Sequence, residues 1–211
     1  MRKKFGILFM LLGVALIGGA VMLLTNNRQE DRQAQAYAQF VLPEIRHEIQ
    51  QAVETTPAET QPSPAEYVPA ELLAPEDVTM SSSYINGYAY IGYLTIGDLG
   101  LELPVMADWD YDRLQIAPCR YSGTVKGEDL VIMAHNYSAH FGRLKQLAVG
   151  ARLQFADMDG KIWQYEVAAM DVLAAENIEE MTAGEYDLTL FTCDTNRTHR
   201  VTVRCNLAAD K

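Results

Sequence analysis

The hydrophobic and polar positions of this chain follow three successive patterns. Residues 5–24 contain no charged side chain, residues 54–75 are rich in proline and glutamate, and from Ser81 onward short apolar or β-branched runs alternate with glycine and aspartate. These runs lie at 89–96, 99–105, 130–134, 152–156, 162–172, 188–193 and 200–206. They predict the strands of an all-β, closed or nearly closed barrel, with short helical turns at 112–116 and 141–147.

The apolar segment of residues 5–24 is long enough to span a membrane. Twenty helical residues extend about 30 Å, the thickness of the hydrocarbon core of a bilayer. Three basic residues precede the segment, and acidic Glu30 and Asp31 follow it, which favours a cytoplasmic tail at residues 1–4 and export of the rest. A cleaved signal peptide is the alternative. Because a secretory apolar core usually has only about 7–15 residues, we expect an uncleaved anchor.

Residues 25–80 are predicted to connect the anchor to the barrel. The stretch 26–53 is polar with scattered apolar residues and predicts a juxtamembrane helix, whereas 54–75 carries five prolines and predicts an extended, poorly ordered linker. Such a linker would let the barrel domain at 81–211 stand away from the bilayer. We expect that domain to fold without the preceding segments.

Charge and composition exclude some classes of function. The chain has a net charge of −11, which argues against a nucleic-acid partner because phosphate contacts need clustered Lys and Arg. Much of the acidic excess lies in residues 44–78, where a solvated stalk explains it. Acidic residues on the barrel portion do not cluster with ligand spacing, so we expect no metal and no other cofactor.

The runs at 188–193 and 200–206 predict a reactive cysteine. Cys193 ends the first run and Arg200 opens the second. If the two runs pair as a hairpin across 194–199, the Cβ atoms of Cys193 and Arg200 lie roughly 4.5–5.5 Å apart. A neighbouring guanidinium favours the thiolate, which is the nucleophilic form of cysteine.

A partner base is expected at the end of another strand. The apolar run 130–134 is followed by His135, at a point where side chains emerge toward a loop. One cysteine with a distant histidine is the usual arrangement for cysteine acyl transfer. His140, further along the loop, and His199, in the turn before Arg200, are the alternatives.

Other arginines and cysteines leave further alternatives. Arg197 lies inside the connector, and Arg204 stands roughly 13 Å beyond Arg200 along the same strand. Three cysteines in an exported domain leave at least one unpaired. Cys119 and Cys205 could form a disulfide, although no spacing rule supports it, or both could be small core residues.

These segments resemble the sortases, the membrane-anchored cysteine transpeptidases of Gram-positive cell surfaces. The stretch Thr189–Cys193 (TLFTC) resembles the family's Thr-Leu-x-Thr-Cys motif, and Arg200 fits the arginine on the strand that follows. His135 and Asn136 resemble its Gly-His-Asn motif, with Ala134 in place of the glycine.

The opening strands carry a further part of the resemblance. Residues 91–105 (IGYLTIGDLGLELPV) resemble the family's Ile-Gly-x-Leu-x-Ile-Pro, with Gly97 where proline is common. The resemblance covers residues 90–207 and implies a sortase-like eight-stranded β-barrel with short helices, preceded by an N-terminal transmembrane helix and a stalk.

The resemblance implies that His135, Cys193 and Arg200 are the catalytic residues. The Cys193 thiolate would attack a backbone carbonyl to form a thioacyl-enzyme. His135 would protonate the leaving amine and then deprotonate the incoming amine, while Arg200 would stabilise the oxyanion or orient the peptide. Asn136 and Thr192 are candidate substrate-binding residues.

The implied partners are exported proteins with a C-terminal sorting signal and an acceptor amine on a peptidoglycan precursor, the cell wall or a pilin. The enzyme would be a single-pass protein of the cell membrane with its catalytic domain outside the cell. The alternative is a catalytically silent surface barrel that binds peptide or glycan, against which the combination of Cys, His and Arg argues. A hydrolytic cysteine protease is a third possibility, which an added amine nucleophile would distinguish. The sequence leaves the sorting motif, the acceptor, the subclass and the oligomeric state open.

Overall fold

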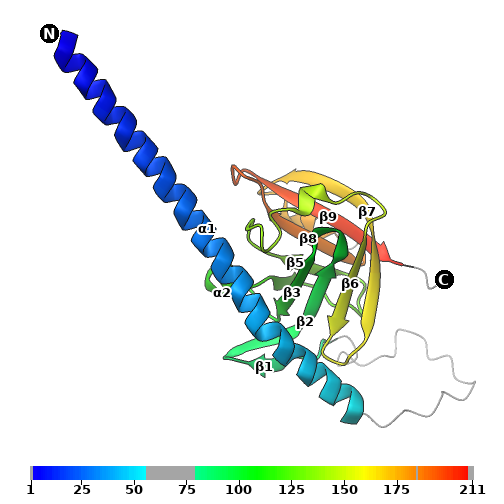
Figure 1. Cartoon of the computed structure of the whole chain (residues 1–211). Coiled ribbons are helices and arrows are strands. Elements are labelled where there is room, and N and C mark those ends of the chain that lie inside the picture. The colour runs from blue at the N-terminus through cyan, green and yellow to red at the C-terminus, as the bar shows by residue number, and fades with distance from the viewer. Residues whose placement is uncertain (1, 56–78, 184, 209–211) are drawn as a thin grey trace, which may run out of the picture.

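A computed structural model describes residues 2–55, 79–183 and 185–208, and in it a β-barrel packs beside one long helix (Figure 1). The predicted linker at 56–78 lies outside the described residues. The side chains of residues 2–9, 23, 24, 26 and 27 also lie outside them, and with them those of the predicted cytoplasmic tail.

The described residues contain helices and strands at the predicted places, with additional short elements between them. The helices are α1 (Arg2–Thr55), α2 (Tyr111–Ile116) and α3 (Ile178–Met181), with 3₁₀ turns η3 (Gly97–Leu99) and η4 (Leu144–Gln146). The strands are β1 (Ser83–Ile85), β2 (Tyr88–Ile96), β3 (Leu101–Met106), β4 (Cys119–Ser122), β5 (Leu130–Met133), β6 (Arg152–Asp157), β7 (Ile162–Ala174), β8 (Leu188–Cys193) and β9 (His199–Leu207).

Eight of these strands close into a ring, which confirms the predicted barrel. Their order is β2-β3-β4-β5-β8-β9-β7-β6, and β6 pairs again with β2. β1 pairs only with the first residues of β2 and lies outside the ring. The pairs β3–β4 and β5–β8 are parallel. Parallel neighbours need a long crossover between them, so segments distant in the sequence meet at one edge of the barrel.

The barrel interior is filled by alternate side chains of the strands. Leu94, Leu103, Phe155, Leu190 and Val203 are each at most 2% exposed and belong to one apolar cluster. Burying each of these side chains stabilises the fold by roughly 1.5–3 kcal/mol before entropy is counted.

Two short strands were not predicted from the sequence, and the structure decides between the two readings of Cys119 and Cys205. β1 and β4 are three and four residues long, too short to show a period-2 pattern, and they were not predicted. Cys119 and Cys205 are both buried and free, so the disulfide alternative is wrong and both serve as small core residues.

The C-terminal half of α1 packs against the barrel. Ala34, Ala38, Val41, Leu42 and Ile45 are all buried, and their spacing places them on one face of the helix. The barrel therefore contacts the helix that precedes the linker in the chain.

Polar contacts fix the same interface along its length. The Tyr37 and Tyr90 hydroxyls lie 2.7 Å apart. Further along the helix, the Arg46 guanidinium lies 2.7 Å from the Glu102 carboxylate, and Ser83 donates a hydrogen bond to the Glu48 carboxylate at 3.2 Å. The helix is therefore a packed element of the domain.

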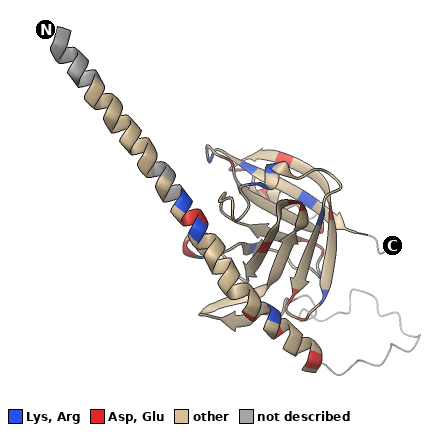
Figure 2. Ribbon diagram, in the orientation of Figure 1, with Lys and Arg blue, Asp and Glu red and all other residues tan. Residues whose placement is uncertain are grey.

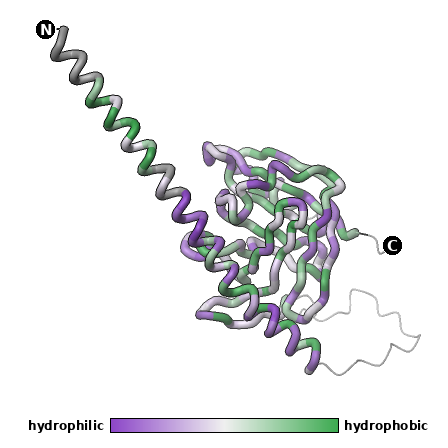
Figure 3. Tube along the Cα trace, in the orientation of Figure 1, coloured by the Kyte–Doolittle hydropathy of each residue, from purple (hydrophilic) through white to green (hydrophobic). Residues whose placement is uncertain are grey.

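The N-terminal half of α1 extends away from the barrel (Figure 3). Met10, Leu12, Leu16, Ile17 and Met22 are all more than half exposed on it. Within the part of the chain that the structure describes, no helix is long and apolar enough to qualify as a membrane span. The predicted anchor at 5–24 includes side chains outside that part.

Candidate active site

The parallel pairing of β5 and β8 brings the two predicted reactive residues to one edge of the barrel. Met133 on β5 is in register with Phe191 on β8, and the backbone N–H of Ala134 donates to the Phe191 carbonyl at 3.2 Å. Because parallel strands point the same way, the residues that follow β5 and the last residues of β8 lie at the same edge of the barrel. His135 and Cys193 therefore meet at this edge.

Arg200 reaches the same edge through the hairpin of β8 and β9. The two strands are antiparallel, and Cys193 is the Cα partner of Arg200, so the hairpin register predicted from the sequence is confirmed. The guanidinium donates to the His199 carbonyl at 3.3 Å. His135, Cys193 and Arg200 all line one cavity of about 220 Å³.

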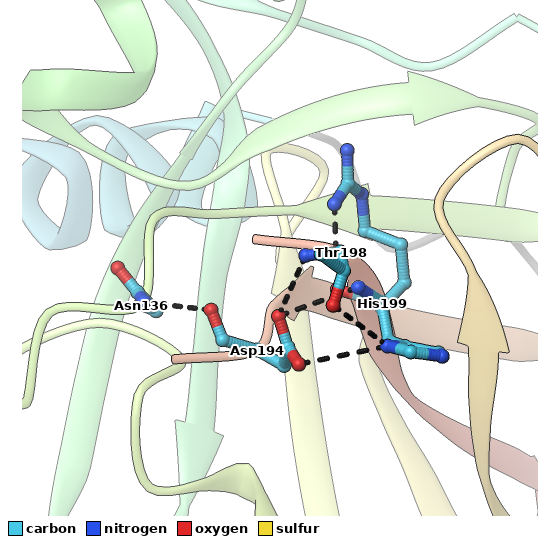
Figure 4. Close-up of polar contacts among 5 residues, drawn as sticks. Asn136, Asp194, Thr198 and His199 are labelled. Carbon is cyan, nitrogen blue, oxygen red and sulfur yellow. Dashed lines mark hydrogen bonds and ion pairs between the residues drawn. The ribbon is translucent and has the colours of Figure 1, made fainter. Parts of the chain in front are cut away.

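Asp194 organises the turn between Cys193 and Arg200 (Figure 4). Its carboxylate accepts hydrogen bonds from the backbone N–H groups of Thr198 at 3.0 Å and His199 at 3.3 Å. Burial disfavours the charged carboxylate, but these backbone bonds and the nearby His199 ring outweigh it and lower the pKa of Asp194. The His199 ring is exposed and lies 3.7 Å from the same carboxylate, which places it on the turn.

The two predicted substrate-binding residues bridge β5 and β8. Asn136 donates from its side-chain amide to the Asp194 carbonyl at 3.3 Å (Figure 4). Thr192 is buried, and its hydroxyl donates to the Ala134 carbonyl at 2.8 Å. Both contacts hold the histidine loop to the cysteine strand. Their role in substrate binding stays a prediction.

His135 lies in an environment that favours its neutral form. Burial lowers the pKa of His135, and the positive charge of Arg197 lowers it further, while the carboxylate of Glu30 opposes both. Its ring packs on Tyr137 with 5.0 Å between the centroids. A neutral imidazole at this position can accept a proton from a thiol or an amine.

The alternative residues lie elsewhere. His140 is 1% exposed, and burial lowers its pKa to about 4. Arg204 is 4% exposed and donates to the Asp171 carboxylate at 2.9 Å and to the Glu180 carbonyl at 2.6 Å. His140 and Arg204 are not among the residues that line the cavity, and their contacts support the fold.

The rest of the cavity wall is apolar and largely aromatic. It is lined by Trp109, Tyr111, Leu114, Tyr121, Met133, Ile178, Met181 and Phe191. The Trp109 and Tyr121 rings stack with centroids 5.5 Å apart. This wall was not predicted from the sequence because its residues come from the loop before α2, from α2 and α3, and from β4, β5 and β8, which only the tertiary structure brings together. The available signal was a pair of aromatic residues in a polar stretch, Trp109 in the loop and Tyr111 at the start of α2.

Within the described residues, no group of three His, Cys, Asp or Glu side chains is placed to hold a metal ion. The arrangement can perform nucleophilic chemistry on a carbonyl group. A thiol, an imidazole and a guanidinium share one cavity, which supplies a nucleophile, a proton carrier and a donor for developing negative charge.

Known proteins share both the sequence pattern and the fold. A family model described as Sortase domain matches residues 94–208. Sortase C from Streptococcus pneumoniae has a TM-score of 0.56 at 20% identity, with 81% of this chain and 97% of that chain covered. Sortase C1 from Streptococcus suis has a TM-score of 0.52 at 26% identity, with 58% and 74% covered. Sortase C1 from Streptococcus agalactiae has a TM-score of 0.53 at 22% identity, with 60% and 72% covered. No curated protein sequence matches this chain.

Proposed function

Because this chain belongs to the sortase family, we propose that it is a membrane-anchored cysteine transpeptidase acting on exported proteins. It cuts the sorting signal of these proteins through a thioacyl-enzyme and joins them to an amine. The observation that carries the proposal is the single cavity lined by His135, Cys193 and Arg200. A silent binding barrel would have no need for these three groups at one site.

In the first half of the reaction, Cys193 gives its proton to His135 and its Sγ bonds to the scissile carbonyl carbon. The carbonyl oxygen becomes an oxyanion, which the Arg200 guanidinium stabilises. The C–N bond then breaks as His135 returns the proton to the leaving amine. The product of this half is a thioester between Cys193 and the exported protein.

In the second half, an incoming amine attacks the thioester while His135 removes its proton. The C–S bond breaks, an amide forms, and Cys193 leaves as a thiolate that recovers its proton from His135. Water at the same position gives slow hydrolysis.

The cavity supports an apolar peptide segment as substrate. Trp109, Tyr121 and Phe191 form a continuous aromatic wall beside Cys193, and such surfaces bind extended apolar side chains. The crystal structure of the Streptococcus pneumoniae sortase C bears on pilin substrate specificity. By extension, both a pilin amine and a cell-wall amine are acceptors to be tested.

The docking of α1 sets where the active site would lie relative to the proposed anchor. The apolar segment ends at Leu24, and Asp31, seven residues later, contacts the active-site loop. Seven helical residues rise about 10 Å. If residues 5–24 span the bilayer, the active site lies close to its outer surface, where the C-terminal segments of exported proteins emerge.

The test is ligation by the detergent-solubilised full chain. A peptide library is incubated with the enzyme, with and without lysine or a short glycine peptide, and products are identified by mass spectrometry. Amine-dependent ligated product that disappears in Cys193→Ala supports the proposal. Hydrolysed product alone at every amine concentration indicates a protease. Failure of any Cys193-dependent turnover, together with specific peptide binding, indicates a silent barrel.

A further inference from the structure

Helix α1 contacts the loop that carries His135. The Asp31 carboxylate accepts a hydrogen bond from the backbone N–H of Ala139 at 2.7 Å, across a sequence separation of 108 residues. One residue earlier on the helix, Glu30 reaches Tyr137: burial raises the pKa of Tyr137, and the charge of Glu30 and a hydrogen bond with it raise the pKa further. Two adjacent carboxylates of α1 thus contact the loop: Glu30 at the second residue after His135 and Asp31 at the fourth. Charged residues mark this part of α1 where the helix reaches the barrel (Figure 2).

Hydrogen bonds within the loop connect the residues that α1 contacts to His135. The N–H of Phe141 donates to the His135 carbonyl at 3.2 Å, and the N–H of Gly142 donates to the Tyr137 carbonyl at 2.8 Å. A Cβ added at Gly142 would clash with the Asn136 carbonyl oxygen, so the loop is closed tightly on itself. These bonds connect the residues that α1 contacts to the backbone of His135.

The same contacts place a charge near the imidazole. His135 is influenced by Arg197 from the turn after β8 and by Glu30 from α1, with opposite signs. The Tyr137 ring lies between His135 and His140, with centroids 5.0 and 5.5 Å away. α1 is thus the source of the carboxylate that favours the charged form of His135.

We propose that Glu30 and Asp31 are positioning residues for catalysis: their contacts with the loop hold it so that His135 stays beside Cys193. The proposal rests on the proposed function, because it assigns His135 the proton transfers. It makes the helix that follows the predicted anchor a part of the catalytic machinery. Neither carboxylate touches the reacting atoms.

Four variants of the full chain test this inference. Asp31→Ala removes the acceptor for the Ala139 N–H, Asp31→Asn keeps an oxygen acceptor without the charge, and Glu30→Gln removes the charge beside His135. Glu44→Ala is the matched control, because Glu44 is an exposed carboxylate on the same helix. Each variant is compared by kcat, KM, the pH profile of kcat/KM and amide hydrogen exchange of residues 135–143.

Asp31→Ala should lower kcat on the order of 10-fold, because a small displacement of a proton-transfer group is costly. KM should change little, the Ala139 amide should exchange faster, and Asp31→Asn should restore most of the activity. In Glu30→Gln, the ionisation that reports His135 should move to lower pH, because the charge that raised its pKa is gone. Glu44→Ala should match the wild type throughout.

Equal kcat, pH profile and Ala139 exchange in Asp31→Ala and Glu44→Ala would overturn the inference. A wild-type enzyme without Cys193-dependent turnover would instead overturn the proposed function. Exchange at Ala139 would still show whether α1 holds the loop. A merely structural role for Asp31 would lower the stability of Asp31→Ala in urea while leaving kcat per folded enzyme at the wild-type value.

Discussion

Replacing Ile45 by alanine tests whether α1 is a packed part of the domain. Ile45 is 0% exposed and contacts the cluster that includes Tyr90, Met106 and Cys119. The change removes about three methylene equivalents, worth about 0.8 kcal/mol each, and leaves a cavity. Alanine is a better helix former by a few tenths of a kcal/mol, which offsets little. The expected loss of unfolding free energy is about 2–4 kcal/mol, within the usual range for such substitutions.

The assay is urea unfolding of the detergent-solubilised chain, followed by tryptophan fluorescence. Trp109 and Trp163 are the two tryptophans of the sequence. Both belong to the barrel part of the chain, so the signal reports the barrel and not the helix. Phe40→Ala is the control, because Phe40 lies on the same helix and is 65% exposed. It should change stability by no more than about 0.5 kcal/mol.

If Ile45→Ala unfolds at the same urea concentration as Phe40→Ala, then α1 is not docked and our description of the interface is wrong. A docked helix also changes the expectation for truncation. Deleting residues 1–78 removes Val41 and Ile45 from the cluster around Tyr90, so the remaining fragment should be less stable than the full chain.

Three further predictions concern the site and its support. Cys193→Ala should abolish ligation and leave unfolding by urea almost unchanged; residual turnover would mean another nucleophile. Arg200→Lys and Arg200→Ala should both lower kcat/KM on the order of 10²–10³-fold, since a point charge does not reproduce the planar fork of donors. Arg197 lies in the exposed turn, and Arg197→Ala should lower kcat/KM much less. Arg204→Ala should destabilise the fold, because Arg204 is buried against a carboxylate, and an unchanged melting temperature would contradict this. Burial holds His140 neutral in the folded state, with a pKa of about 4 against 6.5 when unfolded, so unfolding takes up a proton between these two pH values. The free energy of unfolding should therefore be complete above pH 6.5 and fall on the order of 3 kcal/mol toward pH 4. His140→Phe should flatten this fall in urea titrations at several pH values.

The sequence alone placed the strands that carry the candidate nucleophile. The runs of β8 and β9 are rich in apolar and β-branched residues and the connector between them is short, so one hairpin register puts Cys193 opposite Arg200. Local pattern is enough here because a hairpin is a local structure. His135 was found for a similar reason, since it directly follows the apolar run of β5.

Only the tertiary structure decided which distant segments meet. β5 and β8 are parallel neighbours with more than fifty residues between them, and no local pattern predicts such a pairing because its strands are joined through a long crossover. The aromatic wall around Cys193 combines Trp109 from the loop before α2, Tyr121 from the short strand β4 and Phe191 from β8. No local pattern shows that these three segments meet.

Helix α1 shows most clearly what the sequence predicts and what only packing decides. Its sequence at 26–53 predicts a helix but not a partner, because Ala34, Ala38, Val41 and Ile45 form a narrow apolar stripe among polar residues. Whether such a stripe faces solvent, lipid or a barrel depends on what the rest of the chain places beside it. Here the barrel covers the stripe. The same packing brings the Asp31 carboxylate within hydrogen-bond distance of the Ala139 N–H. The sequence determined the helix and the reactive residues, and packing decided that they touch.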